Sequence, residues 1–352
     1  MKIFPESAIH QLEFDKIKKL LVAYCQSELA KNRAEDLRIH TRKEFIIPEL
    51  SQTNEYQLLL LNQLYFPDNG ALNLSKELKL LGIDGSLLSG NQFHQIKKLA
   101  NAIQQILRWF KTDRRESYPY LAQIIDATYY EKLIVQIIDE VLDEYGIVKD
   151  SASENLARIR MSLYKKRNEL KKVFDKTISR LKKLGYLTDI EESFMNGRRV
   201  LAVFAEQKRM IKGILHGESD SRRTSFIEPL EVTHLNNDVF SLENEETKEV
   251  NIVLQKLTSK IRNYHSLLAT YHNLLGEYDF IRAKAKLSID YNGSLPSLND
   301  KAIVKLYNGY HPLLFIYNKK AQKPIIPVDL SLDEKNRILI ISGPNAGGKT
   351  VT

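Results

Sequence analysis

Apolar side chains recur every three or four residues through most of the first 150 residues, as on one face of an amphipathic helix. Phe14 and Ile17 follow this period, and the same spacing returns over 95–109 and 131–145. Short breaks rich in Pro, Asp, Asn and Gly separate the periodic stretches. We therefore expect 1–150 to form a core of helices.

A much longer helix is predicted over 151–187. Ser151 and Glu154 stand at the two ends of a capping box, in which a hydroxyl and a carboxylate satisfy the first free amides of a helix. Gly185 is the expected stop. About 33 helical residues would extend for about 50 Å, so we expect a projecting arm with a coiled-coil seam. The apolar stripe that predicts this seam is Leu156, Ile159, Leu163, Leu170, Phe174, Ile178, Leu181 and Leu184.

The period then changes to two, which predicts a small β module over 188–229. Its expected strands are 199–204, 210–216 and 224–227. Beyond Pro229 the helical period returns, and we expect a second long helix that runs back to about Ala283, within a segment 230–290. The predicted path is out along one helix, across a β tip, and back along the other.

The pattern changes again over 291–352, where short runs typical of β-strands occur at 302–306, 325–330 and 337–341. The last run, Arg337–Ile341, is continuously apolar after its first residue, as in a buried parallel strand. A glycine-rich segment follows it directly. That segment is Gly343, Pro344, Asn345, Ala346, Gly347, Gly348, Lys349 and Thr350.

This segment matches the P-loop pattern G-x-x-x-x-G-K-[ST] in full. Glycines let consecutive backbone amides curl around phosphates, a lysine reaches the β and γ phosphates, and a hydroxyl binds Mg²⁺. Lys349 and Thr350 are the residues expected in these two roles, with ATP or ADP and Mg²⁺ as the ligands. The alternative is an unrelated glycine-rich turn. Since no acidic Walker B strand follows Thr352, we expect an amino-terminal part of a larger protein that does not turn over ATP by itself.

The composition, 43% apolar and 27% charged, is that of a folded chain, and it restricts the other possible classes. Cys25 is the single cysteine, which excludes an internal disulfide framework and a cysteine-based zinc site. The sequence shows no signal peptide and no apolar run of membrane-spanning length. We expect a cytoplasmic protein without a membrane partner.

The net charge of +8 is concentrated on the first long helix. Residues 158–183 hold eleven basic side chains against only Glu169 and Asp175, a local net charge of +9. Such an imbalance favours contact with nucleic-acid phosphates, although a solvated coiled-coil face is the alternative. The candidate contacts on this helix are Lys165, Lys166, Arg167, Lys171 and Lys172.

A second basic cluster falls in the β module. Arg198, Arg199, Arg222 and Arg223 lie at expected strand ends and loops, where arginines can hold backbone phosphates without reading sequence. The alternative is that they serve only solubility.

The P-loop and several other segments resemble the MutS family of ATPases, and more narrowly its second bacterial branch, which is often fused to a carboxy-terminal Smr nuclease domain. The Gly-Pro-Asn form of the P-loop is the one that these ATPases use. The likeness extends through essentially the whole chain. Its further segments are Leu12–Ile17, Asp150–Ser153, Asn196–Leu201, Ile211–Ile214, Phe226–Pro229, Leu235–Asn237 and Tyr310–Leu314, where Tyr310 replaces the usual arginine of an Arg-His-Pro element.

The resemblance implies a mainly α fold with a helical core, long coiled-coil lever helices, a small β clamp at the tip, and the start of an α/β P-loop ATPase domain. On this reading 151–187 and 230–290 are the ascending and descending levers, and 188–229 is the clamp. It also implies a homodimeric ATPase and places Ile325 near the adenine. Arg222 and Arg223 replace the small residues expected in the clamp turn.

Three functions remain open at this point. The first is an ATP-gated clamp on branched or duplex DNA that suppresses recombination. The second is a ribosome-binding ATPase that uses the same levers on ribosomal RNA and protein to split collided ribosomes. The third is a plain coiled-coil interaction module. DNA and ribosomes are both polyanions, so net charge does not separate the first two.

Overall fold

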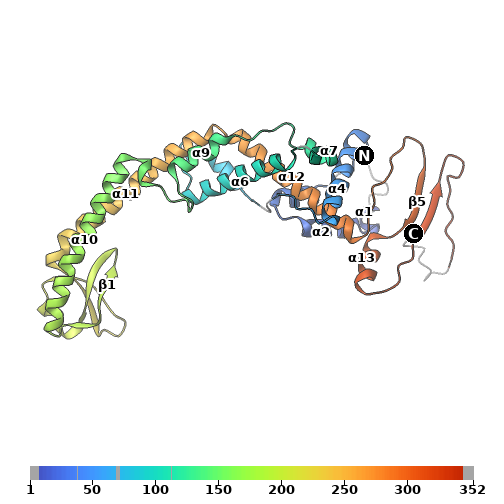
Figure 1. Ribbon diagram of the computed structural model, residues 1–352. Coiled ribbons are helices and arrows are strands. Elements are labelled where there is room, and N and C mark those ends of the chain that lie inside the picture. Colours follow the sequence, from blue (N-terminus) through green and yellow to red (C-terminus); the bar gives the residue numbers. More distant parts are fainter. Residues whose placement is uncertain (1–7, 38, 69–71, 112, 344–352) are drawn as a thin grey trace. The chain divides into compact units, whose positions relative to one another are not determined.

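A computed structural model describes residues 8–37, 39–68, 72–111 and 113–343, and most of these residues are helical (Figure 1). The chain divides into two units. The first unit consists of residues 1–78, 95–132 and 264–352, and the second of residues 79–94 and 133–263. No helix in the described ranges is long and apolar enough to cross a membrane.

The first unit is built around the helix α12 (His265–Asp290), which packs against α2 (Phe14–Tyr24), α3 (Glu28–Glu35) and α4 (Lys43–Leu61). Its Asp279 carboxylate accepts hydrogen bonds from the backbone amides of Gln26 and Ser27, at 2.9 and 2.6 Å. These amides precede α3, so a buried carboxylate fixes where that helix starts. The other helices before the arm are α1 (Ala8–Gln11), α5 (Ser75–Leu81), α6 (Gly90–Trp109), α7 (Asp113–Ser117), α8 (Pro119–Gln123) and α9 (Lys132–Val141).

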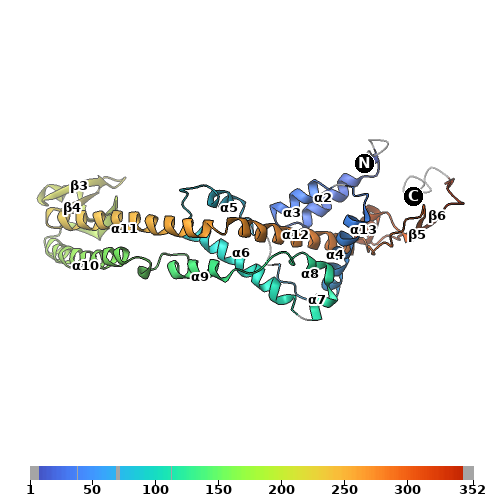
Figure 2. The ribbon, with the colours of Figure 1, turned by 90° about the horizontal axis from the view of Figure 1, so that it is seen from above.

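Two long helices, α10 (Glu154–Lys183) and α11 (Leu230–Arg262), lie side by side in the second unit (Figures 1 and 2). The predicted apolar stripe of α10 forms their seam, except that Ile178 is only partly buried, Leu184 is exposed, and Thr177 joins the buried set. One hydrophobic core connects both helices to the sheet at their end. Its buried members are Leu163, Leu170, Phe174, Leu181, Leu187, Leu201, Val203, Ile227, Val232 and Val239.

The predicted end of α10 is confirmed, but its predicted start is wrong. Ser153, and not Ser151, is the N-cap, because residues 150–152 form a 3₁₀ turn and the Ser153 hydroxyl accepts from the Leu156 amide at 3.4 Å. At the other end Gly185 has the predicted left-handed conformation (φ 71°). The amides of Gly185 and Tyr186 then bond back to Lys182 and Leu181, which is a Schellman motif.

The β module is an antiparallel sheet of four strands in the order β1-β2-β4-β3. Its strands are β1 (Leu187–Met195), β2 (Arg198–Phe204), β3 (Gly213–Glu218) and β4 (Thr224–Pro229), and a 3₁₀ segment (Ala205–Met210) follows β2. Three strands were predicted, and β1 was missed. Its register with β2 shifts between Leu187 and Glu192, and Glu191 has a positive φ of 59°, so its apolar residues do not alternate regularly.

The returning helix is broken, contrary to the single helix predicted as far as Ala283. Helix α11 ends at Arg262 and α12 starts at His265, and the two helices are separate because the backbone leaves the helical region at Tyr264 (φ −101°, ψ 10°). The division between the two units falls at this break.

The carboxy-terminal segment contains β5 (Val304–Gly309), α13 (Pro312–Lys320) and β6 (Val328–Leu332), and the two strands pair antiparallel. The strand predicted at 337–341 is wrong for the described residues. No described strand lies beside it to complete its hydrogen bonds, and Ile340 is 86% exposed. The described residues are therefore mainly helical with a small four-stranded sheet, and they contain no parallel sheet.

Candidate nucleic-acid interface

The eleven basic side chains of 158–183 fall into two groups in the structure. The first group forms ion pairs with carboxylates, and it consists of Arg160, Lys166, Arg167, Arg180 and Lys182. The second group is exposed and has no ion pair with any carboxylate in the described part of the chain. We call it the free cationic face, and it consists of Arg158, Lys165, Lys171, Lys172, Lys176 and Lys183.

The paired group stabilises the two-helix arm. Lys166 lies 3.0 Å from Asp238 and Arg167 lies 2.6 Å from Glu243, and both carboxylates are on α11. The two positions flank the apolar seam on opposite sides, so their side chains reach across to the neighbouring helix. These two candidate contacts therefore already have partners within the protein.

The free cationic face points away from α11. Lys165 and Lys172 follow Leu163 and Leu170 by two residues, which is about 200° around a helix of 3.6 residues per turn. They lie opposite the buried seam, in solvent. Of the candidates on α10, Lys165, Lys171 and Lys172 are thus the ones with charge available to an external polyanion.

Arg198 and Arg199 are held in networks at the sheet. Arg198 lies 2.9 Å from the wholly buried carboxylate of Glu228, and the Asn236 amide and the His216 ring also contact that carboxylate, at 2.9 and 2.7 Å. These contacts join β2, β3, β4 and α11. Arg198 therefore balances a buried charge.

Arg199 has a comparable position between the sheet and α10. Its guanidinium lies 2.7 Å from Glu192 and 3.6 Å from Asp175, and it stacks over the Phe174 ring at 4.7 Å. This arrangement fixes the strand to the helix. Because both its charge and its planar face are occupied, Arg199 has little left to offer a phosphate.

Arg222 and Arg223 are exposed in the turn between β3 and β4. Arg222 adopts a left-handed conformation (φ 54°), and its amide bonds to the Ser219 carbonyl at 2.8 Å. Neither arginine has an ion pair within the described ranges. Lys212 is also exposed, but it lies at the other end of β3, where its carbonyl accepts from the Leu230 amide.

The predicted nucleotide-binding residues lie mostly outside the described residues. Pro344, Asn345, Ala346, Gly347, Gly348, Lys349 and Thr350 all fall there, and Gly343 is the last residue that the structure describes. Ile325 is half-buried in the loop between α13 and β6. Their roles remain predictions.

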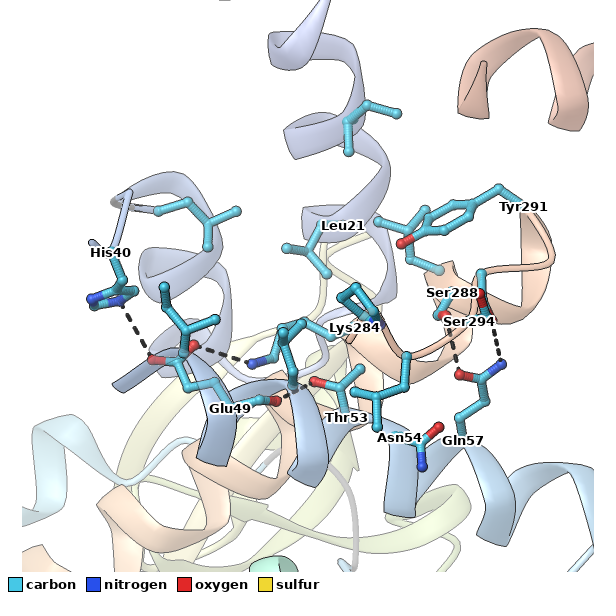
Figure 3. A pocket seen from close by; sticks show the side chains of 18 of the residues that line it. Leu21, His40, Glu49, Thr53, Asn54, Gln57, Lys284, Ser288, Tyr291 and Ser294 are labelled. Atoms are coloured by element: carbon cyan, nitrogen blue, oxygen red, sulfur yellow. Dashed lines mark hydrogen bonds and ion pairs between the residues drawn. The ribbon is translucent and has the colours of Figure 1, made fainter. Parts of the chain in front are cut away.

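A cavity of about 590 Å³ lies in the first unit, between α2, α4 and α12 (Figure 3). Its wall is mainly apolar, and Lys284 lies on it with its amine 3.5 Å from the Glu49 carboxylate. Burial lowers the pKa of Lys284, and Glu49 opposes that shift. No residue pattern had indicated this cavity, because its lining comes from segments more than 200 residues apart. Across the described residues no group of His, Cys, Asp and Glu side chains is placed to hold a metal ion.

Comparison with known proteins relates nearly the whole chain to one set of bacterial proteins. It is 32% identical to the endonuclease MutS2 of Aquifex aeolicus over 98% of its own length and 44% of that protein. It is 30% identical to the endonuclease MutS2 of a Geobacillus species, over 98% of its own length and 43% of that protein. It is 32% identical to the endonuclease MutS2 of Clostridium botulinum, over 99% of its own length and 43% of that protein. No family profile matches the chain. The chain spans less than half the length of these relatives.

Proposed function

Because the chain is homologous to the MutS2 proteins of the MutS family over nearly its whole length, we propose that it belongs to an ATP-dependent clamp on branched or duplex DNA. In this proposal α10 and α11 are the levers, the four-stranded sheet is the clamp, and residues 291–352 begin the ATPase domain. The relatives are named endonucleases, and we assign no nuclease centre to the described residues.

The observation that carries the proposal is the free cationic face. A helix that needed lysines only for pairing with its neighbour would not carry six more basic side chains without carboxylate partners in the described residues. Phosphates of a nucleic acid are the ligand chemistry that neutralises a row of separated cations. Duplex phosphates would lie against Lys165, Lys171 and Lys172, and a second contact would form at Arg222 and Arg223.

ATP with Mg²⁺ is the proposed cofactor, bound at 343–350. Lys349 would contact the β and γ phosphates, and the Thr350 hydroxyl would bind Mg²⁺. Replacement of Lys349 by Ala is expected to abolish ATP binding by a protein of the relatives' full length, measured with a fluorescent ATP analogue. Unchanged binding would remove this assignment. A homodimer formed through the ATPase domains is part of the same proposal.

The experiment that tests the clamp measures fluorescence anisotropy of a labelled four-way DNA junction, titrated with the chain from low to physiological salt. The variant K165Q/K171Q/K172Q removes three charges from the free cationic face. The matched control K76Q/K79Q/K132Q removes three exposed charges elsewhere. The slope of log affinity against log salt falls by about 0.9 for each duplex phosphate contact that is lost.

We expect the first variant to bind at least about tenfold more weakly and to lose about 2–3 units of that slope, while the control binds like the natural chain. Equal affinities for the two variants would exclude the free cationic face as the contact surface. The same three proteins are then measured against ribosomes. A loss of ribosome binding without a loss of junction binding would favour the ribosome-splitting function instead.

A further inference from the structure

Two large side chains are exposed near the amino-terminal end of the free cationic face, between Arg158 and Lys165. Tyr164 is 69% exposed and Met161 is 61% exposed, so neither side chain is buried against the sheet or α11. They are three residues apart, so they are neighbours on the helix surface. Met161 precedes the buried Leu163 by two residues and Tyr164 follows it by one, about 200° and 100° around the helix, so neither side chain lies in the seam.

Basic side chains lie on both sides of this pair along the helix, because Arg158 precedes it and Lys165, Lys171 and Lys172 follow it. Lys165 is four residues after Met161, and Lys171 is seven residues after Tyr164, so both lie within two helical turns of the aromatic ring. Tyr164 has no hydrogen bond or ring contact with a residue in the described ranges. The face of its ring is therefore open to solvent among cationic side chains. A helix face that only contacts water would not need an exposed aromatic ring at this position.

Aromatic rings among separated cations are the combination that binds single-stranded nucleic acid, because a base can stack on the ring while lysines hold the phosphates on either side. In a duplex the bases are stacked on one another, and their faces are not available to a side chain. Methionine adds a polarizable apolar surface of the same kind next to the ring.

We propose that Tyr164 and Met161 form a stacking surface for an unpaired base, with Lys165, Lys171 and Lys172 holding the flanking phosphates. This inference rests on the proposed function and deepens it, because it assigns to the arm a preference for strands with unpaired nucleotides. The phosphate contacts give affinity for any duplex, and the stacking surface adds affinity only where a base is free.

The test compares Y164S with the natural chain by fluorescence anisotropy on three probes: a DNA single strand of about 20 nucleotides, the RNA of the same sequence, and the DNA duplex. Y164F keeps the aromatic face, and Y145S removes a tyrosine that is 76% exposed in the same unit but lies outside the free cationic face. Far-ultraviolet circular dichroism checks that every variant is helical. Single-strand affinity should fall about fivefold or more for Y164S, since stacking on one aromatic side chain contributes that much.

Duplex affinity should change less than about twofold for Y164S, and the salt slope should stay the same because no charge is lost. Y164F and Y145S should bind like the natural chain. The DNA and RNA strands show which sugar the surface accepts. If Y164S binds the single strands as tightly as the natural chain does, the stacking surface is excluded while the clamp stands. If the natural chain binds none of the three probes, the clamp and the stacking surface are both excluded.

Discussion

The guanidinium of Arg198 lies 2.9 Å from the carboxylate of Glu228. Arg198 is the first residue of β2, and Glu228 is wholly buried near the end of β4. Asn236 of α11 donates to the same carboxylate at 2.9 Å. The pair thus lies where the sheet meets the returning helix. It balances a buried negative charge in the β module, and an unpaired charge at this position would be costly.

Removal of Arg198 is expected to loosen the β module. Arg198→Ala leaves Glu228 buried with only His216 and Asn236 as partners, and breaking one side of a buried pair costs about 3 kcal/mol. Amide hydrogen exchange in β2 and β4 measures the local free energy of opening. Arg209→Ala, an exposed arginine of the same module, is the matched control and should change it by less than about 0.5 kcal/mol. Equal exchange in the two variants would contradict the role of Arg198.

Glu55 is expected to hold α8 in place from α4. Its two carboxylate oxygens accept from the backbone amides of Tyr120 and Leu121, at 3.1 and 2.8 Å, in the first turn of that helix. Glu55→Ala leaves two amides unpaired and should lower the unfolding free energy by about 1–3 kcal/mol. Urea denaturation followed by circular dichroism measures the change. If Glu55→Ala lowers the unfolding free energy no more than a substitution at an exposed site, such as Glu44→Ala, the proposed role of Glu55 is refuted.

Acid is expected to destabilise the first unit through His272. Its ring Nε2 accepts the Leu74 amide at 3.2 Å, and burial lowers its pKa below the ordinary 6.5, opposed by a backbone contact at Leu72. Below pH 6.5 the unfolded chain binds a proton that the folded chain does not, so stability falls with falling pH until the folded pKa is reached. The slope contributed is at most about 1.4 kcal/mol per pH unit.

The measurement is urea denaturation at a series of pH values from about 4.5 to 7.5, a window that spans the ordinary histidine pKa. His272→Gln keeps an acceptor at this position and should remove part of the acid dependence. His234→Gln, at an exposed site, should not. The same pH dependence in both variants would show that His272 does not cause it.

Gly185 should resist substitution for a purely conformational reason. It has φ 71° at the end of α10, and a Cβ atom there would meet nothing within 4 Å. Gly185→Ala should therefore cost about 1–2 kcal/mol from backbone strain alone. Gly185→Asn should cost less, because asparagine tolerates the left-handed region. Thermal unfolding compares the stability of the two variants. An alanine variant at least as stable as the asparagine variant would contradict the Schellman interpretation.

Much of the arm could be predicted from the sequence because periodicity reports on burial directly. The seam at Leu163, Leu170 and Phe174 and the stop at Gly185 are local signals, and the structure agrees with both. Strand β1 could not be predicted, since its bulge at Glu191 removes the alternation that identifies a strand. The run at 337–341 failed for the opposite reason, because a strand depends on a neighbour that the residue pattern alone does not supply.

The division of the basic residues of α10 into ion-paired and free side chains could not be predicted from the sequence either. Lys165, Lys166 and Arg167 are consecutive and look equivalent there. Their partners Asp238 and Glu243 are more than 70 residues away, and only the register between α10 and α11 decides which cations they neutralise. The exposure of Tyr164 was predictable in principle, because it falls outside the apolar stripe.

The free cationic face also has a length scale. From Arg158 to Lys183 it runs for 25 residues, about 38 Å at 1.5 Å per residue. One turn of B-form DNA is about 34–36 Å long. At about 3.4 Å per base pair, a duplex needs about eleven base pairs to reach both ends of this row, so a shorter duplex arm of the proposed substrate would leave part of the charge unmatched.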